Sequence, residues 1–511
     1  MRGLEENRIR LLDSNFKQPA PPLSQENLRM NSRYKFSGAF LMNEGKEQTE
    51  ELIAKYFSDV CINKSLSQKV SLGERAIPAF VLDWLISRYS DGKVVDAEKV
   101  QIFLARYLPD KSQKESLLNE LVKGQTLKIL DHYSVRVDVR NGRRILRIPC
   151  LDIFEGRINE EIVDEHPLLL VGNVWGSGTL IRRQDPENVR DWNVWMVDFK
   201  PMQTSYIDLD YFTAQRKHFS LKQWRELLIC SMGYAPETYT PEQQQLLLAR
   251  LVPMVQPRVN IIELAPKGTG KSYIFSQLSR HSWLISGGVV TRAQLFYDMK
   301  VKIAGVITRY DAVILDEIQT INFTNPGEIV GALKGYLESG EFRVMQYQGT
   351  SEASFVLLAN IPIKSDGNPR DTNYFSVLPE FLQESALIDR FHGLIPGWEL
   401  PRIEKSNLHR GYSLKADYFS EVFHALRTRT EYMDYVMEHT KSDGDLRDVR
   451  SVQRIAAGFL RLLFPDLSLV TKEMFEDYCL KPAKRLRSLI RYQLYILDEE
   501  YSDQLATITV F

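Results

Sequence analysis

Cysteine is scarce in this chain: the 511 residues include four cysteines, far apart, at Cys61, Cys150, Cys230 and Cys479. No two of them have the close spacing of zinc-binding or redox-active cysteines, so the sequence predicts neither a zinc site nor a disulfide framework. No apolar run approaches the roughly 18 residues of a membrane-spanning helix. The first residues also lack the apolar core of a secretory signal. These absences predict a cytoplasmic protein with no membrane partner.

A large net charge is also lacking, because 65 basic residues oppose 66 acidic ones. No overall field therefore draws the protein to nucleic acid, and any such contact must come from local basic patches. With 44% apolar and 26% charged residues, the composition is that of a globular protein. The length is sufficient for roughly two to four domains.

The chain begins with a polar segment and then becomes helical. Residues 1–45 contain Pro19, Pro21 and Pro22 and show little periodicity, which predicts a flexible leader. Apolar residues then recur at helical spacing from 47 to 122. This pattern predicts a helical subdomain over 46–125.

A β-rich region is predicted over 126–235. Valines at alternate positions over 135–139 are followed by Asn141-Gly142 and a second apolar segment over 143–148, the pattern of a β-hairpin. Further strand-like segments lie at 168–171, 178–182 and 192–199. These strands predict a compact barrel or sandwich of the OB type. We expect its boundary with the next module near 234–241.

Basic side chains gather around the tip of this hairpin: Arg140, Arg143, Arg144 and Arg147. Arginines placed in this way are suited to grip the phosphate backbone of DNA. A hairpin end solvated by charged side chains is an equally good interpretation. The sequence does not decide between the two.

The most informative stretch follows an apolar segment, 259–264, and precedes a segment with helical spacing, 273–278. Between them stands a glycine-rich loop: Ala265, Pro266, Lys267, Gly268, Thr269, Gly270, Lys271 and Ser272. Strand, loop and helix in this order are typical of the Walker A loop, in which backbone N–H groups and the lysine contact phosphates and the serine binds Mg²⁺. Ala265 replaces the usual glycine and is small enough to be tolerated. The loop predicts ATP and Mg²⁺ as cofactors.

Two adjacent carboxylates, Asp316 and Glu317, follow the apolar segment 312–315 some forty residues later. An uninterrupted apolar segment is typical of a strand buried on both faces of a parallel sheet. Its end then lies beside the bound phosphates, in the manner of a Walker B strand. Asp316 is expected to orient Mg²⁺, and Glu317 to polarise the attacking water.

The next elements narrow the class of ATPase. We predict a helix over 329–337, a hairpin that turns around 348–350, and a strand that ends in Asn360, which is suited to reach the attacking water. This order resembles the sensor 1 region of AAA+ ATPases of the clade that contains the MCM helicases, magnesium chelatase and Lon. Arg390 resembles the arginine with which that clade reaches the γ-phosphate of a neighbouring subunit.

Helical periodicity over 418–437 and 449–463 predicts a helical lid after the sheet. By the same resemblance, Arg450 at the start of the later helix is the sensor 2 arginine that contacts the nucleotide, with Arg447 as the alternative. Five basic residues without an acid between them follow: Lys481, Lys484, Arg485, Arg487 and Arg491. This run is interpreted as a solvated helix face or as a DNA contact.

Taken together, these motifs resemble one family: BrxL, the Lon-like AAA+ factor of BREX phage-defence systems. The resembling segments are 76–85, 168–175, 260–272, 286–288, 293–297 and the strand that ends in Asp316-Glu317. The resemblance implies a DNA-binding N-terminal region joined to an MCM-like motor, assembled as hexameric or stacked hexameric rings around duplex DNA. It also implies other BREX components as partners. Many members continue into a protease-like domain, and we expect this chain to be a short form without one.

The expected architecture is multidomain α/β. The leader, the helical subdomain and the OB-like DNA-binding region come first. An ATPase core with a parallel sheet follows over 236–405. A helical lid with C-terminal helices is expected over 406–511.

The resemblance implies hydrolysis at subunit interfaces, with Arg390 supplied by the neighbour. The hairpin that ends at Thr350 is expected to line the pore, with Arg343 near phosphate and Tyr347 stacking on bases or packing within the hairpin. Two other functions stay open. One is a protein unfoldase, and the other is a DNA-binding scaffold that ATP merely assembles.

Overall fold

The computed structural model describes residues 39–70, 77–90, 94–172, 174–185, 188–202, 207–300 and 302–511. The chain forms two compact units, one of residues 1–61 with 208–511 and one of residues 62–207. Most of the leader expected over 1–45 lies outside the described residues, and a helix already begins at Ala39. None of the helices in these ranges combines the length and the hydropathy that a membrane-spanning helix requires.

The unit of residues 62–207 contains a closed barrel of five strands in the order β2-β3-β4-β6-β5. Neighbouring strands are antiparallel except for β4 and β6, which are parallel. Its helices and strands are α2 (Ala79–Tyr89), α3 (Ala97–Tyr107), α4 (Lys114–Val122), β2 (Leu127–Asp138), β3 (Arg143–Ile148), β4 (Ile153–Ile158), α5 (Glu160–Glu165), α6 (Leu168–Val171), β5 (Val174–Asp185) and β6 (Asn188–Pro201).

The hairpin expected around Asn141-Gly142 is confirmed. Strands β2 and β3 pair across it, with Val137 opposite Arg144. The turn needs a backbone with positive φ, which Gly142 adopts at +64°. Alternate side chains of these strands, such as Val135 and Leu146, are buried in the barrel core.

One strand prediction in this region is wrong. Residues 168–171 form the short helix α6, not a strand. Pro167 occupies the N-cap position, and Leu169 packs into the barrel core. Four consecutive apolar residues do not distinguish a strand from a helix, because neither periodicity is visible over so short a length.

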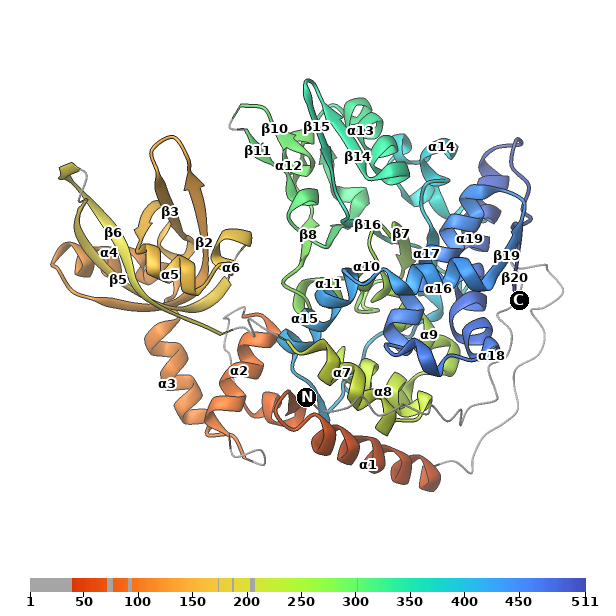
Figure 1. Ribbon diagram of the computed structural model, residues 1–511, viewed down its shortest axis with the longest axis horizontal. Helices are drawn as coiled ribbons and strands as arrows, with labels where there is room; N and C mark the ends of the chain where they lie inside the picture. Colours follow the sequence, from red (N-terminus) through yellow and green to blue (C-terminus); the bar gives the residue numbers. More distant parts are fainter. Residues whose placement is uncertain are drawn as a thin grey trace. The chain divides into compact units, whose positions relative to one another are not determined.

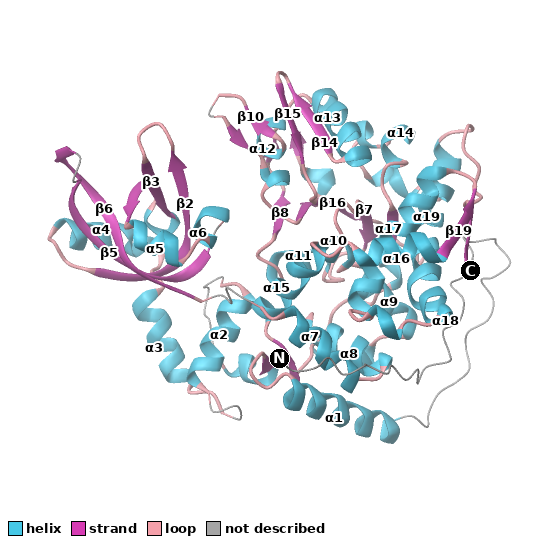
Figure 2. Cartoon of the chain, in the orientation of Figure 1, coloured by secondary structure: helices cyan, strands magenta, loops and turns pink. Residues whose placement is uncertain are grey.

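The larger unit is an α/β domain with a five-stranded parallel sheet (Figures 1 and 2). Its first elements are α1 (Ala39–Tyr56), β1 (Cys61–Asn63, at the division between the units), α7 (Leu209–Gln215), α8 (Leu221–Ser231), α9 (Pro241–Ala249), α10 (Val252–Val255), β7 (Ile261–Ala265), α11 (Lys271–Gln277), β8 (Ser282–Ser286), β9 (Val289–Val290), α12 (Arg292–Leu295), β10 (Tyr297–Asp298), β11 (Ile303–Ala304), β12 (Ala312–Asp316), β13 (Asn322–Phe323) and α13 (Pro326–Ser339).

Its remaining elements are β14 (Glu341–Val344), β15 (Tyr347–Thr350), β16 (Ser354–Asn360), α14 (Ser385–Ile388), β17 (Gly393–Pro396), β18 (Tyr412–Leu414), α15 (Ala416–Arg427), α16 (Glu431–His439), β19 (Thr440–Asp443), α17 (Leu446–Leu463), α18 (Lys472–Phe475), α19 (Lys481–Leu497) and β20 (Thr507–Val510).

The sheet order is β17-β7-β16-β12-β8, and every neighbouring pair is parallel. All residues of β7 and β12 are buried, as is expected of strands covered on both faces. Helices α10, α11 and α19 pack on β16, β8 and β17 respectively. The carboxyl ends of the strands therefore meet at one edge, and their amino ends at the other.

The division between the units falls at residues 207/208, earlier than the region 234–241 that sequence analysis selects. The reason is that α7 and α8 pack on the larger unit. Trp224 of α8 is fully buried, and its indole N–H donates to the carbonyl of Leu462 in α17 at 2.9 Å. That contact spans more than two hundred residues of sequence and leaves no local signal.

Candidate functional site

The glycine-rich loop lies where the sequence places it, between β7 and α11. Gly268 and Gly270 have φ values of +86° and +75°, a region that favours glycine. Thr269 and Lys271 are buried, whereas Lys267 is exposed. The loop thus turns sharply at its glycines and directs the Lys271 side chain toward the end of the sheet.

Lys271 contacts the end of the neighbouring strand. Its amino group donates to Oδ1 of Asn360 at 2.7 Å. Strand register explains this contact, because Asn360 at the end of β16 is paired with Ala265 at the end of β7. Burial lowers the pKa of Lys271, while the nearby charges of Glu263 and Asp316 act in the opposite direction.

Asp316 and Glu317 lie at the same edge, one strand further along. Strand β12 pairs with β16 and ends at Asp316, whose side chain is buried. The backbone N–H of Glu317 donates to the Asp316 carboxylate at 2.9 Å. Glu317 has a φ of +49°, so the chain turns sharply directly after the strand. The three strand ends therefore present a lysine, an asparagine and two carboxylates at one edge.

The chemistry of this edge fits a nucleotide with a magnesium ion. Ser272 and Asp316 offer oxygen ligands, which Mg²⁺ prefers. Lys271 offers a cation for phosphate, and the two glycines keep the loop backbone free of side chains. In the described part of the chain, the N–H groups of 268–270 donate to no acceptor. Amides left available in this way suit an anion such as a phosphate group.

Arg390 lies at the opposite edge of the sheet. It precedes β17 by three residues, and its neighbour His392 donates its N–H to the carbonyl of Asn260, directly before β7. The five residues of β7 then separate Arg390 from the loop of its own chain, a span of roughly 16 Å. Glu338 pairs with Arg390 at 3.2 Å. The structure does not bring Arg390 to its own phosphate loop.

The two sensor 2 candidates lie with Arg390. Arg447, in the first turn of α17, pairs with Glu338 at 2.8 Å and with Asp389 at 2.5 Å. Arg450 is exposed one turn later on the same helix. Glu338 thus holds Arg390 and Arg447 together at the amino edge of the sheet. Arg447, like Arg390, lies away from the loop of its own chain.

The hairpin β14–β15 differs from the expected one in its turn. The residues 348–350 lie in strand β15, and the turn consists of Met345 and Gln346. Met345 has a φ of +52° and is 65% exposed at the tip. The ring of Tyr347 stacks on Tyr297 of β10 at 3.7 Å. Strands β10 and β15 lie close together in Figure 1. Arg343 is exposed on this hairpin.

The arginines around the barrel hairpin do not share one face. Strand alternation puts Arg143 and Arg147 on one side of β3 and Arg144 on the other. Arg144 forms an ion pair with Glu160, and Arg140 is exposed at the turn. A cavity of about 450 Å³ lies beside Arg143 and Arg144. It is also lined by Arg157, Arg183 and Trp195.

Two arginines of the C-terminal basic run, Arg487 and Arg491, lie neither on a solvated face nor on a free DNA-binding face. Arg487 is completely buried and pairs with Asp389 at 2.5 Å and with Asp448 at 2.7 Å. Arg491, also buried, pairs with Asp448 at 3.5 Å. This arrangement is not expected from the sequence, because the partner acids are far from the arginines along the chain.

A buried ion pair that the sequence motifs do not predict lies beside the loop. Arg250 and Glu263 are both fully buried, and their side chains approach to 2.5 Å. Glu263 stands in the middle of an otherwise apolar strand. A carboxylate in that position requires a cationic partner, so this residue was the available signal.

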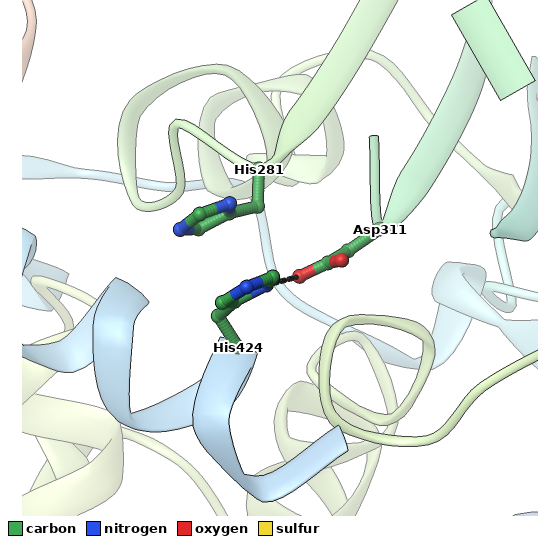
Figure 3. Close-up of side chains that lie close together, drawn as sticks. All are labelled: His281, Asp311 and His424. Atoms are coloured by element: carbon green, nitrogen blue, oxygen red, sulfur yellow. Dashed lines mark hydrogen bonds and ion pairs between the residues drawn. The ribbon is translucent and has the colours of Figure 1, made fainter. Parts of the chain in front are cut away.

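Two histidines and an aspartate meet at the amino edge of the sheet: His281, Asp311 and His424 (Figure 3). Their candidate ligand atoms lie within 4.8 Å of one another. The two imidazole rings are stacked in parallel at 4.0 Å, so their nitrogen lone pairs do not converge. We therefore do not interpret the group as a metal centre.

This group is instead an ion-pair cluster. Asp311 accepts from His424 at 2.7 Å and pairs with Arg427 at 3.5 Å. Glu421 pairs with Arg280 and with His281, each at 2.8 Å. The cluster joins α15 to the segments that precede β8 and β12.

Two family models match the chain. One, described as "Lon-like protease BrxL-like, ATPase domain", matches residues 194–507. The other, described as "BREX system Lon protease-like protein BrxL N-terminal", matches residues 55–182. The two matches cover most of both structural units.

Two curated relatives carry the name "Lon-like protease BrxL". The protein of Escherichia coli O9:H4 (strain HS) is 29% identical over 468 residues, which cover 90% of this chain and 66% of the relative. The protein of Bacillus cereus (strain H3081.97) is 28% identical over 465 residues, which cover 88% of this chain and 68% of the relative. The chain spans about two thirds of the length of each relative.

Proposed function

Because the chain belongs to the BrxL family of Lon-like proteins of BREX systems, we propose that it is an ATPase that forms rings on duplex DNA and serves defence against phage. One observation carries the ATPase proposal. The ends of β7, β16 and β12 bring Lys271, Asn360, Asp316 and Glu317 to one edge of the sheet, beside a loop with available amides.

In the proposed mechanism, bound ATP with Mg²⁺ supplies the phosphoryl group that is transferred to water. The loop amides and Lys271 hold the phosphates, while Ser272 and Asp316 hold the metal ion. Glu317 orients the attacking water and polarises it, and Asn360 contacts the same water. Asn360 also accepts a hydrogen bond from the amino group of Lys271 at 2.7 Å, which places the lysine beside the strand ends.

Arg390 is proposed to act on the nucleotide of a neighbouring subunit. Its place at the amino edge of the sheet supports this proposal, because the loop of the same chain lies at the carboxyl edge. A second copy whose loop faces this edge would receive the arginine where charge develops on the transferring oxygens. Arg447 and Arg450 lie at the same edge, so we assign the sensor 2 role to the same interface.

The barrel is proposed to be the DNA-binding module. Its strand order, its parallel β4–β6 pair and the helices between β4 and β5 support an OB-type barrel. Arg140 and Arg147 are exposed, and Arg143 lines the adjacent cavity, so this part of the barrel is suited to contact phosphates. The hairpin with Arg343 is proposed as a second contact, within the ring. Tyr347 is not assigned a stacking role, because its ring already packs on Tyr297.

A protein unfoldase is the second candidate. Met345, exposed at the tip of the β14–β15 hairpin, favours it, since an apolar tip is suited to grip a polypeptide. An unfoldase does not need the arginines of the barrel hairpin. A DNA-binding scaffold that ATP assembles without hydrolysis is the third candidate.

The test is ATP turnover with and without duplex DNA, measured together with the mass of the assembly. The proposal predicts a multimer whose turnover rises when duplex DNA is added. Turnover that responds to an unfolded polypeptide and not to DNA would favour the unfoldase. Assembly on ATP without turnover would favour the scaffold.

A further inference from the structure

Three successive carbonyl groups of the glycine-rich loop are each held by a different part of the larger unit. The carbonyl of Gly268 accepts from the backbone N–H of Ile403 at 2.9 Å. That of Thr269 accepts from Nη1 of Arg250 at 3.0 Å. That of Gly270 accepts from the hydroxyl of Tyr234 at 3.3 Å. The three donors come from segments before and after the sheet strand β7.

The orientation of these carbonyls fixes the orientation of three amides. In a planar trans peptide, the C=O of one residue and the N–H of the next point in opposite directions. The N–H groups of Thr269, Gly270 and Lys271 therefore point away from the groups that hold the preceding carbonyls. These amides belong to the part of a Walker A loop that contacts phosphate.

Arg250 is the most firmly placed of the three donors. It follows the last residue of α9 and is completely buried. Its Nε lies 3.1 Å from both carboxylate oxygens of Glu263, and Nη2 lies 2.5 Å from one of them. Nη1 remains to hold the Thr269 carbonyl. The planar guanidinium group of Arg250 thus joins β7 to the loop that follows it.

Tyr234 and Ile403 restrict the loop sterically as well. A Cβ atom added at Gly270 would lie 2.3 Å from the hydroxyl oxygen of Tyr234 and 2.3 Å from Cδ1 of Ile403. Gly270 also has a φ of +75°, which side chains disfavour. The loop is therefore held on this side by contacts that only a glycine permits.

We propose that Arg250 and Tyr234 are positioning residues that orient the loop amides for the phosphates of the nucleotide. The proposal rests on the proposed function of the loop as a nucleotide site. Neither side chain needs to touch the nucleotide. Each acts through a loop carbonyl, and loss of either leaves a peptide plane free to rotate.

Arg250→Lys is the first test variant. It keeps a cation opposite Glu263. A single ammonium group, unlike the guanidinium group of arginine, does not also donate to the carbonyl of Thr269. We expect the affinity for ADP to fall about 10-fold or more, as for loss of one hydrogen bond from a charged donor. The melting temperature of the nucleotide-free protein should change by only a few degrees. Both quantities are measured on the full chain, by titration calorimetry and by thermal unfolding.

Tyr234→Phe is the second variant, and it removes only a hydroxyl group. Its matched control is Tyr239→Phe, because the two tyrosine rings lie 6.0 Å apart. Among the described residues, the hydroxyl of Tyr239 makes no hydrogen bond to the loop. We expect weaker ADP binding for Tyr234→Phe, roughly threefold to 10-fold, and unchanged binding for the control.

If Arg250 had a purely structural role, its replacement would lower the stability without changing ADP binding. Replacement of a buried arginine remote from the loop shows what that result looks like. Arg216 is also completely buried and donates to the carbonyls of Phe219 and Leu463, away from the loop. Arg216→Met should lower the melting temperature without changing the affinity for ADP. The double variant Arg250→Met/Glu263→Leu removes the buried pair and should keep much of the stability, since apolar replacement of such a pair is often tolerated. Its ADP affinity should remain low.

The outcomes separate this inference from the proposed function. If the wild-type protein binds ADP, and Arg250→Lys and Tyr234→Phe bind it equally well, the positioning roles are wrong and the nucleotide site stands. If the double variant keeps its stability and binds ADP as tightly as the wild-type protein, Arg250 has only a structural role. If the wild-type protein and Lys271→Ala bind ADP equally weakly, the nucleotide site itself is wrong.

Discussion

The amino group of Lys271 donates a hydrogen bond to Oδ1 of Asn360 at 2.7 Å. The bond joins the loop after β7 to the end of β16, the strand that separates β7 from β12. Burial lowers the pKa of Lys271, and the charges of Glu263 and Asp316 oppose that shift. In the proposed mechanism, a cation held at this place is already oriented for the phosphates of the nucleotide.

Lys271→Ala should abolish this arrangement. We expect the affinity for ATP to fall by roughly 10-fold to 100-fold, because the variant cannot make a charge-assisted hydrogen bond to phosphate. Lys267→Ala is the matched control, since Lys267 lies in the same loop but is exposed. Titration calorimetry measures both variants. Equal loss of affinity in the two variants would mean that only the overall charge of the loop matters.

Glu317→Gln should separate binding from hydrolysis. The amide keeps the size of the side chain but does not accept a proton, so turnover should fall roughly 100-fold or more. ATP should still bind and support assembly. Glu438→Gln, an exposed position on α16, serves as the control. A Glu317→Gln protein with normal turnover would remove Glu317 from the proposed mechanism.

The cluster of His281, Asp311 and His424 predicts a pH-dependent stability. The hydrogen bond that His424 donates to Asp311 is the main cause that raises the pKa of His424 above its usual value. Its stabilisation is therefore fully present below about pH 6.5, the usual value of an unfolded histidine, and is lost as the pH rises through the raised value. Burial lowers the pKa of His281, which opposes folding only below about pH 6.5.

The measurement is denaturant unfolding of wild type and His424→Gln between about pH 6.5 and 9, above the window in which His281 titrates. Glu421 and Arg427 also face this cluster, and Arg280 pairs with Glu421. We expect the stability difference between the two proteins to shrink as the pH rises. A constant difference would contradict the assignment.

The barrel arginines predict a change in the salt dependence of DNA binding. Charge reversal at Arg143 and Arg144 should weaken binding to duplex DNA and reduce the slope of log affinity against log salt by about 0.9 for each phosphate that the protein no longer neutralises. Lys128→Glu, an exposed position elsewhere on the barrel, is the control. The measurement is a salt titration by fluorescence anisotropy. An unchanged slope would exclude this hairpin from the DNA interface.

Much of the fold follows from local sequence pattern. The strand before Lys271 is apolar except for Glu263, and the strands that end in Asp316 and Asn360 are each marked by an uninterrupted apolar segment. The barrel hairpin is marked by Asn141-Gly142 between alternating residues. Such signals are local because they reflect the conformation of a few neighbouring residues.

What could not be predicted depends on contacts between distant segments. Arg487 is basic and lies in a basic run, yet Asp389 and Asp448 bury it in ion pairs. Arg250 meets Glu263 only because the residue that follows α9 is brought beside β7. The sequence left open which of Arg447 and Arg450 is the sensor 2 arginine. The structure shows that Arg447 shares Glu338 with Arg390.

The central claim is that one catalytic site needs two subunits, and a mixing experiment tests it most directly. Lys271→Ala lacks a working loop, and Arg390→Ala lacks the arginine for its neighbour, so each protein alone should be inactive. Arg370→Ala, an exposed arginine outside the site, is the control and should stay active. When the two inactive proteins are mixed, about a quarter of the interfaces in a heterologous ring hold both an intact loop and an intact arginine. We predict that ATP turnover returns on mixing. No recovery in a mixed assembly, or normal turnover by Arg390→Ala alone, would contradict the account.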